Sequence, residues 1–559
     1  MKKFLAGLLL TLSLLWPLFV SPYFTHHDDV QIIRLFEMDK CIKDNQIPCR
    51  WVPDLGGLMG YPLFNYYAPL PYYYGEIFYL LTGSLLISAK IMFATAFVGS
   101  FLFMFLLGRK LWGNTGGSIS AIFYSLAPYH AVDLYVRGAM GELWALMFFP
   151  AVFWSILRLS QNLTLPSLLL TAVLTALSIT SHNLSTMLFM PFAAAWVLIL
   201  FVTHKQIKFL WYSFFAFVLG LSLSAFYLLP MSFEQNLVHV ETTTYGYFHY
   251  TEHFKGFKKL FIERFWGWGA SVREVPGGEK DGMSFQIGWV HIAAWLLALL
   301  AIRRFWKNKF VTRVVIFSSI AAAISIFMVN PRSQFIWDFI PPLKYIQFPW
   351  RLLMFVIFFI SVISGSLVLL YKRKIIWIAL IIAVIIFNYS YFRPQRFIQT
   401  SDTLLLSGVN WDRQIKRSIF DYLPIYAKEP PAELATSRYE ILTGDSKIID
   451  FKEGTNWITF KTQTYSHTII RLSQYYFPNW KIFVDGNEIN VEYKNNSLGL
   501  MTIILGKGDH VVTARLYDTH IRSISNGISL LGFAITVILF LASVGRIRGW
   551  LKYYRKRIN

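Results

Sequence analysis

Apolar runs about as long as a lipid bilayer is thick recur along almost the whole of this chain. Crossing the hydrocarbon core takes about 20 mainly apolar residues in a helix, because each backbone polar group must be satisfied within the segment. The first run follows MKK at the N-terminus, and the others cover 87–107, 115–129, 141–158, 165–182, 184–203, 209–230, 285–302, 311–329, 350–370, 375–392 and 523–545. The sequence therefore predicts a mainly α polytopic transmembrane bundle of about 12 spans.

Composition agrees with a lipid environment. Only 15% of the 559 residues are charged and 55% are hydrophobic, whereas soluble domains have about 25% charged residues. The net charge of +21 would favour a nucleic-acid partner in a soluble protein. Here the basic residues stand in short clusters beside apolar runs. No basic stretch belongs to a folded element that could bind nucleic-acid bases. We therefore predict membrane lipid as a partner, with anionic headgroups attracting some of this charge, and no nucleic acid.

The basic clusters also predict the orientation of the chain. The first apolar run ends in Pro22, Tyr23 and Phe24 instead of small residues, so it is interpreted as an uncleaved signal anchor with Met1 in the cytoplasm. Twelve spans then place every dense cluster on the cytoplasmic side, as the positive-inside rule requires. These clusters are Arg109-Lys110, Arg158, Lys205 to Lys208, Arg303 to Lys309, Lys372 to Lys374 and Arg546 to Arg557. The prediction is a multi-pass cell-membrane protein with both termini in the cytoplasm.

This topology divides the chain into three parts. Residues 1–392 form the transmembrane module with a large extracytoplasmic loop at 21–86, residues 393–522 form an extracytoplasmic β-rich domain, and residues 523–559 form the last helix and a basic tail. Within 437–516, segments of alternating hydrophobicity such as WITFKTQT are separated by Asp485-Gly486 and by Gly506 to Gly508. Such alternation with turn residues predicts hairpins in an antiparallel sandwich.

Two cysteines, Cys41 and Cys49, fall in the first extracytoplasmic loop. That compartment permits oxidation, so a disulfide closing a short loop is one interpretation. The alternative is two free thiols, because the sequence does not supply the Cα separation that a bridge needs.

Ionisable residues gather at the predicted outer ends of the spans. HHDD at 26–29 follows the first span, HAVDLYVRGAMGE at 130–142 contains Arg137 and Glu142, and His182 ends the fifth span, while IQFPWR at 346–351 carries Gln347 and Arg351. Each has a structural alternative: a polar helix cap for HHDD, an i, i+4 pair of Asp133 with Arg137, and a snorkelling Arg351. The spans themselves hold almost no Asp or Glu, which argues against an ion-coupled transporter.

These stretches resemble the GT-C superfamily of membrane glycosyltransferases, in which a first span is followed by a long outer loop that opens with an acidic pair. The chain is also similar to bacterial multi-pass proteins labelled "6-pyruvoyl-tetrahydropterin synthase-related" and to YfhO-like membrane proteins. The similar stretches are HHDD (26–29), 47–73, APYHAVDLYVRGAMGE (127–142), SHN (181–183), QFPWR (347–351) and YYFPNWKIFVDG (475–486). Nothing in the chain resembles the His-ligand set of a zinc-dependent pterin synthase.

The resemblance implies transfer of a sugar from a polyprenyl-phosphate donor to an envelope glycan, lipid or protein acceptor, a hexosyltransferase-type reaction. It implies a catalytic base at Asp29 or Asp28, with Asp29 slightly preferred. Arg137 and Arg351 are candidates to bind the donor phosphate, Gln347 lies beside them, and Glu142 and His182 are candidates to orient the acceptor. Some superfamily members use Mg²⁺ or Mn²⁺, for which Asp28, His27 and Glu142 are the candidate ligands.

Two other functions use the same features. A transporter or flippase of a lipid-linked glycan would need the same outer groove without chemistry. A non-catalytic envelope assembly factor would use the 393–522 domain to bind a partner, and the acidic pair would then be dispensable.

Overall fold

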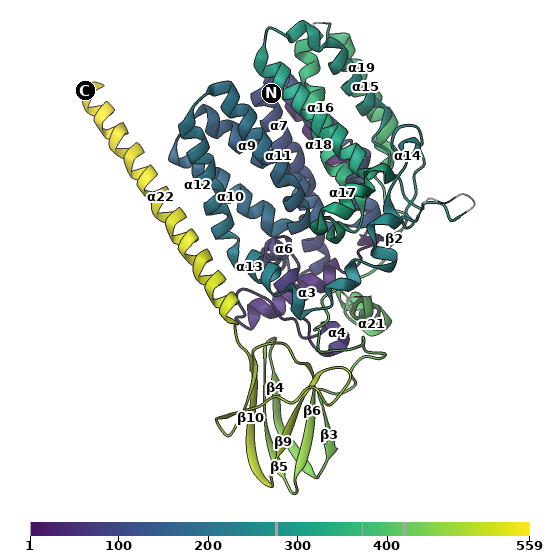
Figure 1. The fold of residues 1–559 in the computed structure, drawn as a ribbon, viewed down its shortest axis with the longest axis vertical. Coiled ribbons are helices and arrows are strands. Elements are labelled where there is room, and N and C mark those ends of the chain that lie inside the picture. The colour runs from purple at the N-terminus through teal and green to yellow at the C-terminus, as the bar shows by residue number, and fades with distance from the viewer. Residues whose placement is uncertain (1, 274, 276–277, 372, 418–420, 559) are drawn as a thin grey trace.

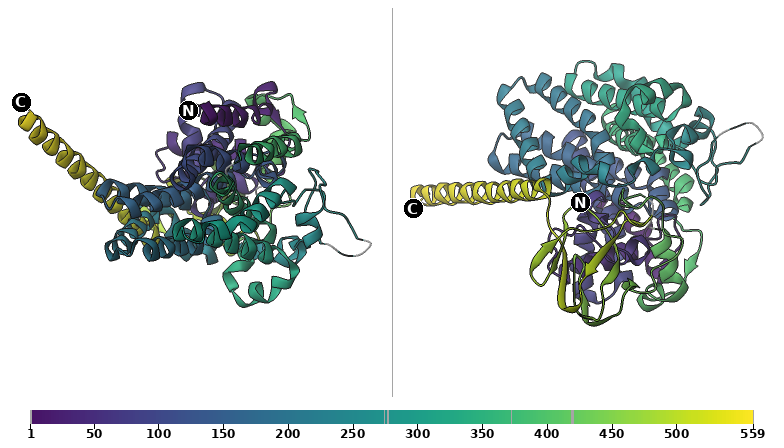
Figure 2. Two further views of the ribbon diagram at one scale, coloured as in Figure 1. Left: turned by 90° about the horizontal axis from the view of Figure 1, so that it is seen from above. Right: turned by 60° about the horizontal axis from the view of Figure 1, so that its bottom comes forward.

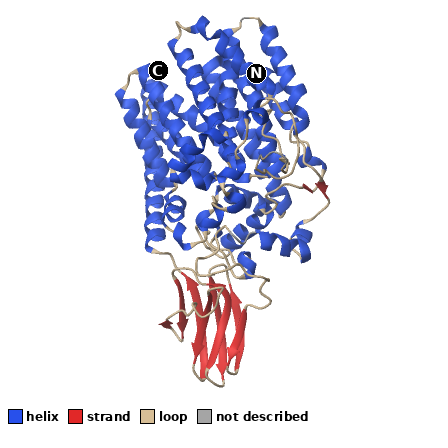
Figure 3. Cartoon of the chain, turned by 45° about the vertical axis from the view of Figure 1, so that its right-hand side comes forward, coloured by secondary structure: helices blue, strands red, loops and turns tan. Residues whose placement is uncertain are grey.

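The protein consists of a helical bundle and a separate strand-rich domain below one end of it (Figure 1, Figure 3). The structure, a computed structural model, describes residues 2–273, 275, 278–371, 373–417 and 421–558. Lys372 of the predicted basic cluster therefore lies outside the described residues. The ordered succession of long apolar helices followed by short alternating strands agrees with the prediction of a mainly helical chain with a C-terminal β-rich domain.

Most of the predicted spans correspond to helices of the bundle. These are α1 (Lys2–Ser13), α2 (Pro17–Val20), α7 (Leu85–Ser125), α9 (Met140–Gln161), α10 (Leu165–Ser181), α11 (Asn183–His204), α12 (Ile207–Leu223), α13 (Ala225–Phe233), α15 (Trp289–Ala301), α16 (Lys309–Val329), α18 (Leu353–Leu370), α19 (Lys374–Asn388) and α22 (His520–Ile558). The centre of the bundle is apolar, and α9 and α18 are its most buried helices.

Short helices connect the long ones. They are α3 (Gln31–Lys43), α4 (Leu55–Leu58), α5 (Leu63–Tyr66), α6 (Leu70–Thr82), α8 (Pro128–Ala131), the π-helix η1 (Val132–Arg137), η2 (Gln235–Leu237), η3 (Val240–Thr243), η4 (Gly246–Phe248), η5 (Tyr250–His253), α14 (Phe257–Phe261), η6 (Ile302–Phe305), η7 (Pro331–Ser333), α17 (Gln334–Phe339), η8 (Pro341–Ile346), η9 (Pro349–Leu352), η10 (Tyr389–Tyr391), α20 (Asp402–Leu405) and α21 (Gly408–Arg417).

The long helix α7 is two helices joined at a sharp break. Gly113 takes φ 75° and ψ 177° there, a conformation that residues with a side chain rarely adopt. The two halves pack so closely that a Cβ on Gly117 would lie 2.6 Å from the backbone nitrogen of Arg109. The predicted runs 87–107 and 115–129 are therefore the two arms of one helical hairpin.

A second break lies between α12 and α13. The predicted run 209–230 is bent by 73° at this point, so it is not one straight helix. Among the described residues, seven helices are long and apolar enough to cross a membrane, or eight if this bent pair forms one span. The count of about 12 spans stays a prediction.

The predicted basic links meet at one end of the bundle, which we call the terminal end. Contacts across this end join Lys3 to Thr115 (2.9 Å), Lys110 to Gln161 (3.1 Å), Arg313 to Thr203 (3.0 Å) and Arg304 to Leu370 (3.3 Å). Both chain termini lie at this end in Figure 1, and the strand-rich domain lies at the other, which we call the domain end. Which side of the membrane each end faces stays a prediction.

The strand-rich domain is built from two antiparallel sheets. One has the order β4-β5-β10-β7-β8 and the other β3-β6-β9. The strands are β3 (Tyr439–Thr443), β4 (Ser446–Glu453), β5 (Trp457–Thr464), β6 (Thr468–Tyr475), β7 (Trp480–Val484), β8 (Asn487–Ile489), β9 (Leu500–Leu505) and β10 (Gly508–Leu516). Alternate side chains of β5 and β6 are buried, as expected where one face of each sheet covers a shared core.

One of the two predicted hairpin turns is present, and the other is wrong. Asp485 and Gly486 have φ 52° and 82° and join β7 to the adjacent β8, the geometry of a two-residue hairpin. Gly506 to Gly508 instead link β9 of the smaller sheet to β10 of the larger one. A glycine-rich turn between two alternating segments does not reveal whether the chain continues in the same sheet or crosses to the facing one.

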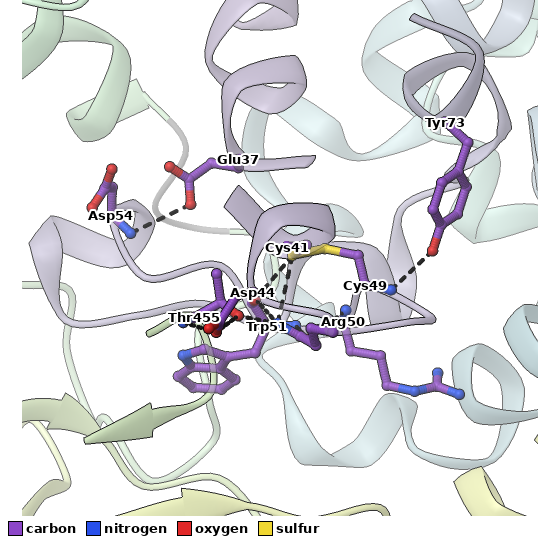
Figure 4. The surroundings of a disulfide bond; sticks show 10 residues. Glu37, Cys41, Asp44, Cys49, Arg50, Trp51, Asp54, Tyr73 and Thr455 are labelled. Atoms are coloured by element: carbon purple, nitrogen blue, oxygen red, sulfur yellow. Dashed lines mark hydrogen bonds between the residues drawn. A yellow bond between two sulfur atoms is a disulfide. The ribbon is translucent and has the colours of Figure 1, made fainter. Parts of the chain in front are cut away.

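The first loop ties the domain to the bundle. Cys41 and Cys49 form a disulfide with their Cα atoms 5.5 Å apart (Figure 4). In the loop that it closes, Asp44 Oδ2 accepts hydrogen bonds from the backbone nitrogen (2.6 Å) and the hydroxyl (2.7 Å) of Thr455. Asp44 Oδ1 accepts another from Trp457 Nε1 at 2.9 Å. A short cross-linked loop therefore holds the beginning of β5.

Replacing Cys41 and Cys49 by serine is expected to loosen this attachment. A disulfide that closes a loop of about nine residues stabilises by about 2–3 kcal/mol in the chain-entropy description. We expect faster hydrogen exchange of the Thr455 amide, which Asp44 binds, and unchanged exchange of the Lys461 amide in the middle of β5. Equal exchange of the Thr455 amide in the variant and the wild type would show that the loop keeps its shape without the bridge.

The last helix, α22, stands at the edge of the bundle. It runs along α12 and α13 and leads away from the other helices when the molecule is seen from above (Figure 2). Only 11% of the most apolar part of His520–Val544 is buried, so most of this stretch is exposed at the surface of the bundle. The helix returns the chain from the strand-rich domain to the terminal end.

Candidate active site

The acidic stretch after the first helices lies against the turn that precedes α9. The backbone nitrogen of His27 donates to the carbonyl of Val136 (3.0 Å), and that of Asp28 donates to the carbonyl of Arg137 (2.9 Å). These two bonds hold residues 27–28 alongside the end of η1. Asp28 and Arg137 are thus brought together although they are far apart in the sequence.

Gly138 allows this close approach. Its φ is 63°, and a Cβ at this position would lie 2.3 Å from Nδ1 of His26, so a larger residue does not fit. Burial lowers the pKa of His26 to about 4, which keeps its ring neutral at pH 7. Gln31 adds a hydrogen bond from its Nε2 to the carbonyl of Gly138 at 2.9 Å. The backbone beside Asp28 is therefore held by three separate contacts.

Behind Asp28 lies a buried cluster of charged residues at the start of α9. Arg137 Nη1 is 2.5 Å from Asp133 Oδ1 and 2.9 Å from Glu142 Oε2. The other oxygen of Glu142 accepts a hydrogen bond from the Tyr129 hydroxyl at 2.5 Å, and Arg351 Nε lies 3.4 Å from Glu142 Oε2. Asp133 and Glu142 are at most 1% exposed. Burying two carboxylates is tolerable here because two guanidinium groups balance their charge.

Arg351 is positioned by the turn that precedes α18. Its Nη1 donates to the carbonyl of Ile346 (2.8 Å) and lies 3.4 Å from Oε1 of Gln347. Its guanidinium also stands 4.9 Å from the ring centre of Phe348. Gln347 has φ 64°, a strained conformation for a residue with a side chain, and such strain is often found at functional sites. Local contacts therefore fix the direction of the Arg351 side chain.

His182 borders the same cluster. Its Nδ1 accepts a hydrogen bond from the backbone nitrogen of Ser185 (3.2 Å) and caps α11. A Cβ on Gly141 would lie 3.1 Å from Cδ2 of His182, so the ring packs against the first turn of α9. The charge of Glu142 acts on His182 from there. The predicted site residues Arg137, Glu142, His182, Gln347 and Arg351 thus form one group at the domain end.

Two acidic residues reach solvent at the edge of this group. Asp28 is exposed, and its charge acts on Arg34, Arg137 and Arg351. Asp421, which follows the α21 segment, is also accessible to solvent. Enclosure by the surrounding protein raises the pKa of Asp421, while Arg34 opposes this shift. The accessible edge of the site therefore carries two carboxylates, with the arginines largely buried behind them.

The predicted metal ligands are not brought together. Nε2 of His27 lies 2.9 Å from the carbonyl of Trp268, and Glu142 is occupied by two arginines and the Tyr129 hydroxyl. In the part of the chain that the structure describes, no group of three or more His, Cys, Asp or Glu residues could hold a metal ion. In the described residues His27, Asp28 and Glu142 do not form a ligand set, and a requirement for a metal ion stays a prediction.

Three residues of the site could not be identified from the sequence. Arg34 packs on the ring of Tyr67 at 4.0 Å and lies on α3, where its position in the pattern is that of an ordinary helix residue. Tyr129 lies within the stretch 127–142, but an aromatic residue beside an apolar run is usually interpreted as part of the hydrophobic core. Asp421 comes from the segment before the strand-rich domain, and no local motif marks it.

No protein-family profile matches the chain. One curated protein, an uncharacterized protein of Lactococcus lactis subsp. cremoris (strain MG1363), is 22% identical over 207 residues, which are 35% of this chain and 34% of that protein. The chain thus spans about a third of that relative. The resemblance to YfhO-like and pterin synthase-related proteins stays a prediction.

Several solved structures are similar in outline. Arabinofuranosyltransferase AftD from Mycobacteria is 14% identical with a TM-score of 0.44, covering 70% of this chain and 27% of its own. The Archaeoglobus fulgidus oligosaccharyltransferase is 13% identical with a TM-score of 0.43, covering 75% and 56%. ArnT from Cupriavidus metallidurans, bound to undecaprenyl phosphate, is 13% identical with a TM-score of 0.40, covering 68% and 62%. This chain spans less than two thirds of each, and likeness at this level assigns no activity.

Proposed function

We propose that this protein is a membrane glycosyltransferase that transfers a sugar from a polyprenyl-phosphate donor to a cell-envelope acceptor. The observation that supports it best is the exposed Asp28, whose backbone nitrogen donates to the Arg137 carbonyl, beside the buried cluster of Arg137, Arg351 and Glu142 at one end of an apolar bundle. A lipid-linked substrate needs this combination, because its tail stays in the bilayer while its phosphate and sugar react at the surface. Guanidinium groups bind phosphate oxygens through paired hydrogen bonds.

The reaction would proceed by direct displacement. The acceptor hydroxyl oxygen forms a bond to the anomeric carbon while the bond from that carbon to the phosphate oxygen breaks, which inverts the anomeric configuration. Asp28 takes the proton of the attacking hydroxyl, as a general base. We prefer Asp28 to Asp29 because Asp28 is exposed and its backbone nitrogen donates to the Arg137 carbonyl. Arg137 and Arg351 stabilise the departing phosphate, and Glu142 holds both of them in place.

The orientation of the site in the cell belongs to this proposal. The Cys41–Cys49 disulfide lies in the first loop, at the domain end, and disulfides persist in oxidising compartments outside the cytoplasm. The basic links gather at the opposite end, as expected of cytoplasmic loops. Both features support a site that faces the extracytoplasmic side, where envelope acceptors are found.

The direct test is a transfer assay with the purified protein in nanodiscs. The donors are a mixed pool of polyprenyl-phosphate sugars, the acceptor is glycan released from the host envelope, and parallel samples contain Mg²⁺, Mn²⁺ or EDTA. Transfer with inversion is the expected result, and the EDTA sample decides whether a cation is required. Carrier binding without any transfer or hydrolysis would contradict the proposal and favour a transporter of the lipid-linked glycan.

Arg351→Gln is expected to weaken donor binding. The substitution removes the guanidinium that lies 3.4 Å from Glu142, and a hydrogen bond to a charged group contributes about 1.5–3 kcal/mol. The donor concentration for half-maximal transfer should therefore rise about 10- to 150-fold. Arg304→Gln is the matched control, because Arg304 binds the Leu370 carbonyl at the terminal end. If both variants need the same donor concentration for half-maximal transfer, Arg351 does not contribute to donor binding.

A further inference from the structure

A cavity of about 650 Å³ opens in the loop between α13 and α15. We call it the loop cavity, and its lining residues are Gly246, Tyr247, His249, Glu252, His253, Val272 and Arg273. Its volume lies in the range of about 300–1,000 Å³ that is usual for ligand sites. None of these residues belongs to the site described above.

The loop cavity adjoins the arginine cluster through two aromatic side chains. The ring of Phe348 lies 4.5 Å from that of His253, a residue of the cavity wall, and 4.9 Å from the guanidinium of Arg351. Trp350 packs against Phe348 and lies 4.7 Å from the guanidinium of Arg137. The rings of His253 and Phe348 therefore separate the cavity from the guanidinium of Arg351.

A directional chain of hydrogen bonds makes this wall rigid. Trp350 Nε1 donates to Ser271 Oγ at 3.1 Å, and Ser271 Oγ lies 3.0 Å from Nδ1 of His253. Nε2 of His253 lies 2.5 Å from the carbonyl of Tyr247, which can only accept. Burial lowers the pKa of His253 to about 4, so the ring is neutral. Its Nε2 then donates to Tyr247, and the hydroxyl of Ser271 donates to its Nδ1.

The lining has the character of a carbohydrate site. The ring of Tyr247 is half exposed, and an aromatic face with a polar edge suits the apolar face and the hydroxyl groups of a sugar ring. Glu252 and Arg273 lie 3.4 Å apart, so the wall offers an acceptor and a donor of hydrogen bonds with little net charge. Such balance does not favour a polyanion, and the polar lining does not favour a lipid tail.

We infer that the loop cavity binds the acceptor and that this acceptor is a glycan. The inference rests on the proposed function, because it identifies the second substrate of the same reaction. The cavity borders the proposed donor site, because the ring of its wall residue His253 packs on Phe348, which in turn packs on Arg351.

The test compares Tyr247→Ala combined with Glu252→Gln against Tyr245→Ala in nanodiscs. Tyr245 is 61% exposed in the same segment and does not line the cavity, so it controls for loss of a surface aromatic residue. Two rates are measured with the polyprenyl-phosphate sugar pool: donor hydrolysis without glycan, and transfer to oligosaccharides released from the host envelope. We expect the cavity variant to need at least tenfold more oligosaccharide for half-maximal transfer, with unchanged donor hydrolysis. Equal oligosaccharide dependence in both variants would overturn the inference.

A second measurement separates this inference from the proposed function. Saturation-transfer NMR with the same released oligosaccharides reports binding without turnover. If the wild type neither hydrolyses the donor nor transfers its sugar, the proposed function fails. The NMR signals then test, independently of any reaction, whether the loop cavity binds a glycan. Signals present with Tyr245→Ala and lost with the cavity variant would support the glycan site, whereas equal or absent signals with all proteins would overturn it.

Discussion

Asp28→Asn is expected to lower the rate of sugar transfer by about 10²–10⁴-fold, the usual contribution of a positioned general base. Asparagine has nearly the same shape, and the hydrogen bond from residue 28 to the Arg137 carbonyl comes from the backbone. The fold should therefore be unchanged. The amide cannot take a proton from the acceptor hydroxyl at neutral pH. We expect kcat to fall while the donor concentration for half-maximal transfer changes little.

Asp29→Asn is the matched control, since it removes the neighbouring carboxylate by the same chemical change. It should keep at least a tenth of the wild-type rate. Melting temperatures in nanodiscs and the disulfide content show whether either variant has lost its structure. A large loss with Asp29→Asn and normal transfer by Asp28→Asn would move the base to Asp29. Normal transfer by the variant with both substitutions would exclude Asp28 and Asp29 as the base.

Arg522→Met is expected to destabilise the protein by about 3–5 kcal/mol, because it leaves a buried carboxylate without its cation. Arg522 Nε lies 2.9 Å from Glu234 Oε2, and the two side chains are 1% and 3% exposed. Glu234 also accepts hydrogen bonds from Asn65 (3.0 Å) and Thr519 (2.5 Å). This ion pair joins the first loop, the end of α13 and the start of α22, so its loss should release the last helix.

A double variant distinguishes loss of charge balance from loss of packing. In Glu234→Gln with Arg522→Met, the amide oxygen can accept from Asn65 while the amide nitrogen donates to the Thr519 hydroxyl, and the buried ion pair is gone. Most of the lost stability should return, since a buried ion pair is often close to neutral overall. Thermal unfolding in nanodiscs measures both variants. Equal melting temperatures for the single and double variants would show that Arg522 acts mainly through its packing on Phe477, whose ring lies 4.9 Å from its guanidinium.

Periodicity and turn residues predicted which segments form helices and strands. They predicted less well where a helix bends and which strands pair. The segment WITFKTQT corresponds to β5, and the run 141–158 lies within α9, because both patterns depend only on local burial. The break at Gly113 and the 73° bend after α12 were not predicted, since an apolar run does not show where its helix turns back. The same limit explains the wrong hairpin at Gly506 to Gly508.

Site residues that lie together in one short stretch of sequence were predicted. Those brought together from distant stretches by the fold were missed. Arg137 and Glu142 come from one polar stretch that interrupts apolar runs, which is why they stood out. His27 does not lie with Glu142, because its ring bonds the Trp268 carbonyl while Glu142 is bound by Arg137 and Arg351. Asp421 could not be found, since its place beside Arg34 results from the path of the chain between two domains.

The route of the chain around Asp28 also has a consequence for biosynthesis. The strand β1 (Tyr23–Phe24), just before the acidic stretch, pairs with β2 (Phe397–Ile398), and Thr25 is bound to the carbonyl of Arg396. The ribosome therefore synthesises ten or more helices after β1 before it synthesises β2, the strand that pairs with β1. Until then Asp28 lacks this support, and Asp421 is still to come. If the proposed function holds, a nascent chain is thus inserted into the membrane long before it can react with lipid-linked sugars.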